Sequence, residues 1–276
     1  MRNIRFGIRI VLVLLLFLIS AFIMGLLKIM IRLFNHDLAD KVIFKFVKPF
    51  CLVLNKICGI RLQIEGQENI PEKNGFLVVG NHYSYIEAFC TMSIVPAVPV
   101  SKEEIKSWPV FGLAARIGGT VFVNRDKGGV SGRYIESLVQ TLKKNINIIF
   151  FPEGTTTDGT YLKRFKSALF VVANRLKVPV LPTVSTVVSI EGKAVPQDKR
   201  DMIAWYGGVP FIPHITQVLK YRYVELKFKI GKPVIPEYDD TSLNERRAFA
   251  VRIQTYMDSM LRSIDPLYKG IINDPK

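Results

Sequence analysis

The chain has 276 residues and a mass of 31.3 kDa, and about half of its residues are apolar, which excludes a disordered protein and allows a large buried core. Its three cysteines are too few and too unevenly spaced for a disulfide framework, and its three histidines lack metal-site spacing. The net charge of +15 would suit nucleic acid, but residues 1–64 carry ten Lys and Arg against two Asp, and this part is also the most apolar. This distribution argues against a nucleic-acid partner and indicates a membrane surface.

Residues 10–27, IVLVLLLFLISAFIMGLL, form an uncharged run of eighteen residues. As a helix the run would be about 27 Å long, just under the hydrocarbon thickness of a bilayer. The basic start is also typical of a signal peptide, but the run is long for one and lacks a clean small-x-small cleavage site. We therefore expect a membrane anchor that either spans the bilayer or dips into it.

The next segment, residues 40–60, places four lysines at helical spacings and apolar residues on other faces. It predicts a helix in the membrane interface, kinked near Pro49, with its lysines toward anionic headgroups. The alternative is an ordinary amphipathic helix packed on the core. Positive charge flanks the apolar run on both sides, so the positive-inside rule does not fix the topology, and a hairpin fits. The four lysines are Lys41, Lys45, Lys48 and Lys56.

After residue 60 the chain alternates between β-rich runs and helical stretches, which predicts an α/β layer fold. We find no internal repeat and no linker, so we expect a membrane arm at 1–60 and one α/β domain at 61–276. Ser242 with Glu245 forms a capping box that opens the last helix. The expected strands are 61–66, 75–80, 118–124, 145–151, 178–184 and 223–234, and the expected helices are 84–95, 129–144, 165–176 and 243–262.

His82 and Glu87 lie five residues apart, and in one continuous helix their side chains would point about 140° away from each other. If the preceding strand ends before His82 and Ser84 lies near a helix cap, Glu87 falls in the first turn and can point back at the imidazole. The carboxylate would then fix the tautomer of His82 and stabilise its protonated form. The pair is two-thirds of a triad without a protein nucleophile, so His82 would deprotonate a hydroxyl of the substrate. The alternative is a loop histidine with an incidental carboxylate nearby.

Two later blocks add polar groups to this site. A strand-like run delivers Asn124 and Arg125, and Pro152 stops another strand before a turn at residues 153–155. The cations Lys163, Arg164 and Lys166 follow that turn and would suit a phosphate or another anionic headgroup. A solvated basic face is the alternative for the lysines.

Taken together, these blocks resemble the glycerolipid acyltransferase family, typified by bacterial 1-acylglycerol-3-phosphate acyltransferases, over residues 60–235. The family's first block, N-H-x-S-x-x-D, is matched by Asn81, His82, Ser84 and Glu87. The second block, which ends in aromatic-x-D-R, corresponds to residues 122–125, the third to FPEGT at 151–155, and the fourth to VPVLP at 178–182.

The resemblance implies a mixed, mostly parallel sheet flanked by helices, with His82 as general base and Glu87 as its partner. It implies that Arg125 binds a headgroup phosphate, that the third block surrounds the acceptor glycerol, and that the fourth is a strand near the acyl side. The substrate-binding residues expected overall are Asn81, Ser84, Arg125, Glu153, Gly154, Thr155, Lys163 and Lys166.

Three positions depart from the family pattern: Glu87 and Asn124 replace Asp, and Ser167 replaces a frequent Gly. The segments FPEGTTTDG, FKSALF and AWYGGVPFIPH look more like the lyso-ornithine lipid acyltransferase branch. In the last segment, the aromatic side chains could form a lip at the membrane interface or pack in the core. They are Trp205, Tyr206, Phe211 and His214.

The sequence therefore predicts an O-acyltransferase of the inner membrane, with its catalytic domain on the cytoplasmic face, where thioester donors are found. The donor would be a thioester of acyl carrier protein or coenzyme A, and the acceptor a lysolipid, first of all 1-acyl-sn-glycerol-3-phosphate. Lyso-ornithine lipid is the alternative acceptor. No metal or redox cofactor is expected. The competing class is a membrane-attached protein that binds anionic lipid without chemistry, in which Glu87 marks a decayed site.

Overall fold

A central sheet dominates the computed structural model, which describes residues 2–123, 132–239 and 242–272. Its strands run in the order β1-β9-β7-β2-β5-β3-β4, and a short β8 pairs with β7. Every pairing is parallel except those of β7 with β9 and β8, so the sheet is mixed and mostly parallel, as expected. The strands are β1 (Ile60–Glu65), β2 (Leu77–Gly80), β3 (Val98–Lys102), β4 (Val121–Val123), β5 (Ile148–Phe150), β7 (Val180–Ile190), β8 (Lys193–Ala194) and β9 (Val224–Ile230).

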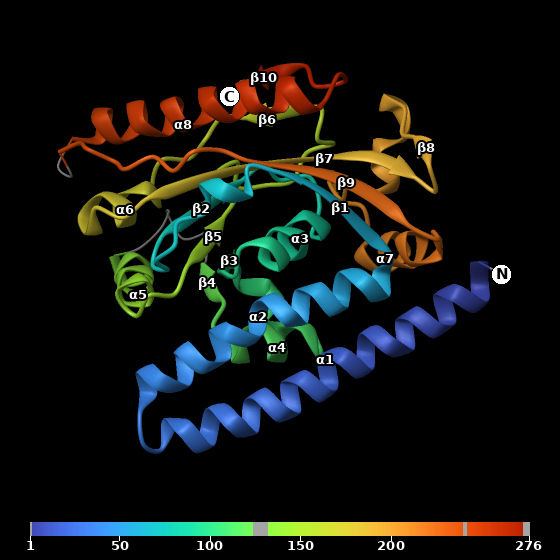
Figure 1. The fold of residues 1–276 in the computed structure, drawn as a ribbon, viewed down its shortest axis with the longest axis horizontal. Coiled ribbons are helices and arrows are strands. Elements are labelled where there is room, and N and C mark those ends of the chain that lie inside the picture. Colours follow the sequence, from blue (N-terminus) through green and yellow to red (C-terminus); the bar gives the residue numbers. More distant parts are fainter. Residues whose placement is uncertain (1, 124–131, 240–241, 273–276) are drawn as a thin grey trace.

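Helices cover both faces of this sheet (Figure 1). One face carries α5 (Gly132–Lys143), α6 (Phe170–Leu176) and α8 (Leu243–Ile264), and the other carries α2 (His36–Cys58), α3 (Ile86–Ile94) and α7 (Phe211–Lys220). Because both faces are covered, β2 is buried along its whole length, which explains its uninterrupted apolar sequence. The remaining elements are α1 (Arg2–Arg32), α4 (Phe111–Ile117), η1 (Gln67–Asn69), η2 (Glu103–Ser107), η3 (Gln197–Met202) and a small parallel pair of β6 (Tyr161–Lys163) with β10 (Gly270–Ile272).

The helix α2 packs against the α/β layer. Its Phe44 belongs to the core on the α8 side of the sheet, and its Cys51 belongs to the core on the α3 side. The Asn35 side chain caps the start of the helix by accepting a hydrogen bond from Leu38 N at 2.9 Å, and Gly59 ends it in a left-handed conformation. The helix thus packs on the core with its four lysines exposed, and its position in the membrane interface stays a prediction. The domain boundary at residue 60 stays a prediction.

The helix α1 lies outside α2 and forms a hairpin with it (Figure 1). Within the described residues it is the one helix long and apolar enough to cross a membrane. Only a narrow seam of Val13, Phe17 and Ala21 is buried, and the opposite face presents apolar side chains to the outside. An apolar face that runs along a whole helix is not expected to face water in a monomeric protein.

Cationic side chains fasten both ends of α1 to the rest of the fold. Arg5 donates a hydrogen bond to Lys220 O at 2.9 Å, and Arg9 donates to Leu219 O, Tyr221 O and Arg222 O, so both reach the carboxyl end of α7. Lys28 donates to Ile117 O, at the carboxyl end of α4, at 2.9 Å. These cations satisfy carbonyls that a helix leaves unpaired, at its negative pole.

Several local expectations differ from the structure. β3 was not expected because Pro99 interrupts its pattern, and α4 and α7 were not expected either. The helix expected at 165–176 begins only at Phe170 because tertiary contacts take earlier backbone donors: Phe165 N binds Gln254 Oε1 at 3.4 Å and Lys166 N binds Pro152 O at 2.9 Å. Ser242 does cap α8 by accepting from Glu245 N, but the Glu245 carboxylate accepts from Asp239 N, so the capping box is only half formed.

Candidate active site

His82 and Glu87 meet at the carboxyl end of β2. The strand ends at Gly80, a loop carries His82, and Glu87 stands in the first turn of α3. The imidazole Nδ1 lies 2.6 Å from Oε1 of Glu87. The pairing inferred from the sequence is therefore present, and the additional methylene of Glu relative to Asp does not prevent it.

The surroundings of Glu87 fix the state of the imidazole. The Glu87 carboxylate is buried, 1% exposed, near the positive pole of α3, and its Oε1 also accepts a hydrogen bond from Tyr83 N at 3.2 Å. A carboxylate only accepts hydrogen bonds, so Nδ1 of His82 carries the hydrogen and Nε2 keeps its lone pair. The His82 side chain is 23% exposed. This geometry suits a general base that works through Nε2.

Glu153 binds the backbone of the loop at residues 81–85, which carries His82 and which we call the reactive loop. Its Oε1 accepts a hydrogen bond from His82 N at 2.7 Å, and its Oε2 accepts one from Lys163 N at 3.0 Å. The side chain is 3% exposed, and burial raises its pKa to about 8, although the two backbone donors oppose that shift. We expected Glu153 to contact the acceptor, but in this structure its carboxylate is enclosed and joins the reactive loop to β6.

Phe151 supports the imidazole from one side. The rings of Phe151 and His82 are stacked, with centroids 4.2 Å apart and planes 13° apart. A Cβ added to Gly80 would lie 2.7 Å from Cε1 of Phe151, so the bare backbone at Gly80 admits the ring. The phenyl ring therefore sets the orientation of the imidazole, together with Glu87.

Asn81 and Ser84 are buried beside the pair. The Asn81 side chain donates to Ser185 O at 3.0 Å and accepts from Ser185 N at 2.8 Å, which ties the loop to β7. Ser84 is fully buried, its Oγ has no hydrogen-bond partner, and α3 is capped at Tyr85 without a side-chain bond. Ser84 thus lies next to the N-cap residue of α3, as expected, and the substrate-binding roles of Asn81 and Ser84 stay predictions for two buried side chains.

The remaining predicted residues surround the turn after β5. Gly154 adopts a left-handed backbone conformation with φ of +75°, and the Lys166 side chain lies over it, 2.8 Å from the position of an added Cβ. Thr155 and Lys166 are exposed, and Lys163 is half-buried. The structure therefore brings Gly154, Thr155 and Lys166 to one turn beside the histidine loop. Asn124 and Arg125 lie outside the described residues.

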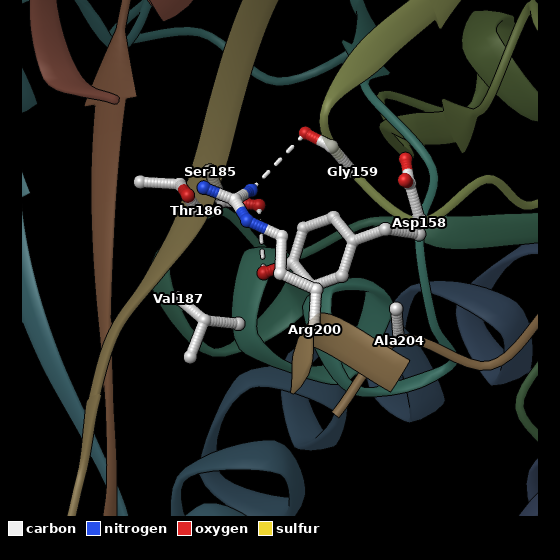
Figure 2. Close-up of a pocket in the computed structure, with 8 residues that line it drawn as sticks. Asp158, Gly159, Ser185, Thr186, Val187, Arg200 and Ala204 are labelled. Carbon is white, nitrogen blue, oxygen red and sulfur yellow. Dashed lines mark hydrogen bonds between the residues drawn. The ribbon is translucent and has the colours of Figure 1, made fainter. Parts of the chain in front are cut away.

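A buried ion pair of Arg200 with Asp265 was missed in the sequence; Figure 2 shows Arg200 and its hydrogen bond to Gly159. Arg200 Nη2 binds the Asp265 carboxylate at 2.7 and 2.8 Å, and its Nη1 donates to Gly159 O at 3.3 Å. Gly159 lies against the Tyr83 side chain, since an added Cβ would be 3.3 Å from Tyr83 Cβ. A small pocket beside this network is lined by Tyr83, Asp158, Gly159, Ser185, Thr186, Val187, Arg200 and Ala204. Arg200 and Asp265 are 65 residues apart, so sequence spacing gave no signal for their pairing.

The comparisons with known proteins agree with this geometry. A family model described as Acyltransferase matches residues 61–186, which contain β2, the reactive loop, α3 and Glu153. Residues 61–186, a little under half of the chain, are thus similar to the Acyltransferase family. The match and the names of the relatives support acyltransferase activity for the chain.

Several curated acyltransferases are similar to the chain. It is 29% identical over 219 residues to the lyso-ornithine lipid O-acyltransferase of Rhizobium meliloti (strain 1021), a match that covers 77% of this chain and 73% of that one. It is 43% identical over 119 residues to the 1-acyl-sn-glycerol-3-phosphate acyltransferase of Neisseria gonorrhoeae, which covers 41% and 45% of the two chains.

Among solved structures, the crystal structure of the 1-acyl-sn-glycerophosphate acyltransferase PlsC from Thermotoga maritima superposes with a TM-score of 0.61 at 22% identity. The superposition covers 94% of this chain and 98% of that one. At this identity the likeness shows the fold alone. Within the described residues, no group of three His, Cys, Asp or Glu side chains is placed to hold a metal ion.

Proposed function

We propose that this acyltransferase moves a fatty acyl group from a thioester to the free hydroxyl of a lysolipid, with His82 as the general base. The observation that carries the proposal is the 2.6 Å contact of His82 Nδ1 with the buried Glu87, which leaves Nε2 as the working nitrogen. His82 takes the proton of the acceptor hydroxyl, and the oxygen attacks the carbonyl carbon of the thioester. When the tetrahedral intermediate collapses, the carbon–sulfur bond breaks and His82 returns the proton to the departing thiolate.

Glu87 acts on the charge of the ring during this cycle. The imidazolium that forms in the first step sits against a carboxylate that is enclosed by protein, where electrostatic attraction is stronger than in water. Phe151 and the backbone bond from His82 N to Glu153 keep the ring and the loop in place. The site therefore needs little rearrangement when the ring takes up the proton.

For the acceptor, we propose 1-acyl-sn-glycerol-3-phosphate, which would give phosphatidic acid. The 43% identity to the Neisseria gonorrhoeae enzyme, which acts on that class by its name, and the exposed Lys166 beside Gly154 support this choice. Lyso-ornithine lipid is the second candidate because the relatives with that name match about three quarters of the chain. A thioester of acyl carrier protein or coenzyme A is the proposed donor.

The outer face of α1 supports a location on the membrane, and the ties at both ends of this helix favour one orientation. Arg5 and Arg9 hold it to α7, and Lys28 holds it to α4, so it cannot stand upright in a bilayer without taking the domain along. We therefore propose that the hairpin dips into one leaflet. We place it in the inner membrane, on the cytoplasmic face, where acyl carrier protein and coenzyme A thioesters are made.

The deciding experiment measures thiol release by the purified chain in vesicles, from acyl-carrier-protein and coenzyme A donors, with either lysolipid or none. We expect release that depends on the acceptor. Release equal with and without lysolipid, or no release together with stoichiometric lipid binding, would contradict acyl transfer to a lysolipid and favour a lipid-binding protein. Comparing the two lysolipids decides between the two headgroups.

A further inference from the structure

An exposed apolar tip is formed by Val209 and the first turn of α7, and we call residues Val209, Phe211 and Ile212 the α7 lip. The Ile212 side chain is 68% exposed and Val209 is 37% exposed, and Leu113 of α4 adds a third exposed apolar group at 46%. Gly207 and Gly208 lead into the lip with positive φ angles and have open space around them. The lip is thus a projecting apolar turn instead of part of either core.

The α7 lip is joined directly to the reactive loop. Trp205 N donates to Tyr83 O at 2.7 Å, and Trp205 Nε1 donates to Val209 O at 2.7 Å. The Phe211 ring lies 5.1 Å from the ring of Tyr85. Tyr83 and Tyr85 follow His82 in the loop before α3, so any surface that covers the lip also lies beside this loop.

The α7 lip is linked through α4 to the buried seam of α1. Phe211 contacts Phe111 of α4 at 5.9 Å between ring centroids, and Phe111 contacts Phe17 in the buried seam of α1 at 4.7 Å. The helix α1 packs on both α4 and α7, and Arg5 reaches the far end of α7. Consequently α1, α4 and the start of α7 lie on one side of the sheet (Figure 1).

Charge indicates what covers this surface. Neither α1 nor residues 203–222 contain an acidic side chain, whereas Arg2, Lys220 and Arg222 lie at their ends. Glu191 pairs with Arg2 and Arg5 at this margin, which is otherwise basic. An apolar surface with a mainly basic margin fits a bilayer with anionic headgroups.

We propose that the α7 lip is a second membrane contact, separate from the helical hairpin, that inserts at the boundary between headgroups and acyl chains. Its role is to hold the His82 loop against the bilayer, so that a lysolipid presents its hydroxyl without leaving the membrane. This proposal rests on the proposed membrane location of the enzyme.

The chain supplies its own probes, because its two tryptophans both belong to this region. Trp108 lies 4.9 Å and Trp205 5.9 Å from the Phe211 ring, between centroids. The test uses full-length Trp108→Phe protein, which leaves only Trp205, and vesicles of phosphatidylethanolamine and phosphatidylglycerol with bromine on the acyl chains. We expect the fluorescence of Trp205 to be quenched more strongly by bromine near the headgroup than by bromine near the chain end.

Sedimentation with the same vesicles separates this proposal from the one it rests on. Protein that sediments with vesicles while Trp205 is not quenched would overturn the lip contact and leave the membrane location standing. Protein that does not sediment would overturn the membrane location itself.

Substitution of Ile212 gives a second, independent measurement. Removing one inserted side chain of this size weakens vesicle binding by about tenfold or somewhat more. We therefore expect Ile212→Ser to reduce both vesicle affinity and quenching, and to raise KM for vesicle-borne lysolipid while kcat on a short-chain, water-soluble lysolipid is unchanged. The matched control is Ile235→Ser, an equally apolar residue that is 51% exposed at the edge where β2 and β7 begin. Equal effects of both substitutions would contradict the proposal.

Discussion

Phe151 occupies the space that a side chain on Gly80 would need, and its ring stacks on the imidazole of His82. Gly80 is the last residue of β2, and Phe151 directly follows β5, which pairs with β2 in parallel, so the two residues meet at one edge of the sheet. A glycine at the last position of β2 is therefore required by the packing of the next strand, and the orientation of the reactive histidine depends on it.

We predict that Gly80→Ala lowers kcat by an order of magnitude or more, because the new methyl group displaces the Phe151 ring on which His82 rests, and a small misplacement of a reacting group is costly. Acceptor-dependent thiol release measures the loss. Adding Phe151→Leu to Gly80→Ala should restore part of the activity by making room for the methyl group. A double variant that is slower than Gly80→Ala would show that displacement of the ring is not the cause.

Substitutions of His82 and Glu87 should lower the rate of acyl transfer to different extents. His82→Ala should reduce transfer by about 10²- to 10⁴-fold, the usual contribution of a general base, with a normal circular-dichroism spectrum and melting temperature. Glu87→Asp keeps the charge and should retain more activity than Glu87→Gln, which no longer stabilises the imidazolium. Near-normal turnover of purified His82→Ala would remove His82 from the mechanism.

The sequence revealed the reactive pair because its evidence is local. The strand before Gly80 and the helix after Tyr85 are both short-range patterns, and together they bring Glu87 back to His82. The alternation of strands and helices likewise predicted the layered fold, since each element carries its own period.

What could not be predicted depends on contacts between distant segments. The enclosed position of Glu153 follows from β6, which is three residues long and has no sequence period of its own. Arg200 pairs with Asp265, which directly follows α8 and is 65 residues away in the sequence, so only the tertiary fold brings the two side chains together. β3 was missed because Pro99 interrupts its strand pattern. In the folded chain the proline lies where the pairing of β3 changes from β5 to β4.

Glu153 should make stability depend on pH. Its pKa is about 8 in the folded state, because of burial, and near 4.5 when the chain is unfolded. Between these values the folded state holds a proton that the unfolded state has released, so the contribution of Glu153 to stability falls as pH rises from about 4.5 toward 8, by up to about 1.4 kcal/mol per pH unit.

Urea denaturation of wild type and Glu153→Gln at a series of pH values measures this effect. The variant should be less stable at low pH, because the amide nitrogen opposes one of the two backbone donors, but the free-energy difference from wild type should shrink as pH approaches 8. A difference that is constant over this range would show that Glu153 is already ionised in the folded protein at low pH.

The buried Arg200–Asp265 pair should be far more important for stability than an exposed ion pair. Both side chains are almost completely buried, Thr186 Oγ1 donates to Asp265 at 2.7 Å, and Leu267 N donates to it at 2.9 Å. Removing one partner leaves the other charge buried and unpaired, which typically costs about 3–5 kcal/mol. We expect Arg200→Met to lower the free energy of unfolding by that amount, and Arg200→Met with Asp265→Leu to lower it by less. Additive losses in this double-mutant cycle, measured in urea, would show that the two side chains are not coupled.

Arg200 also binds Gly159 O beside Tyr83, so Arg200→Met should reduce kcat more than it changes KM. Arg262→Met, which breaks the exposed pair with Asp258, is the control and should alter neither kcat nor KM.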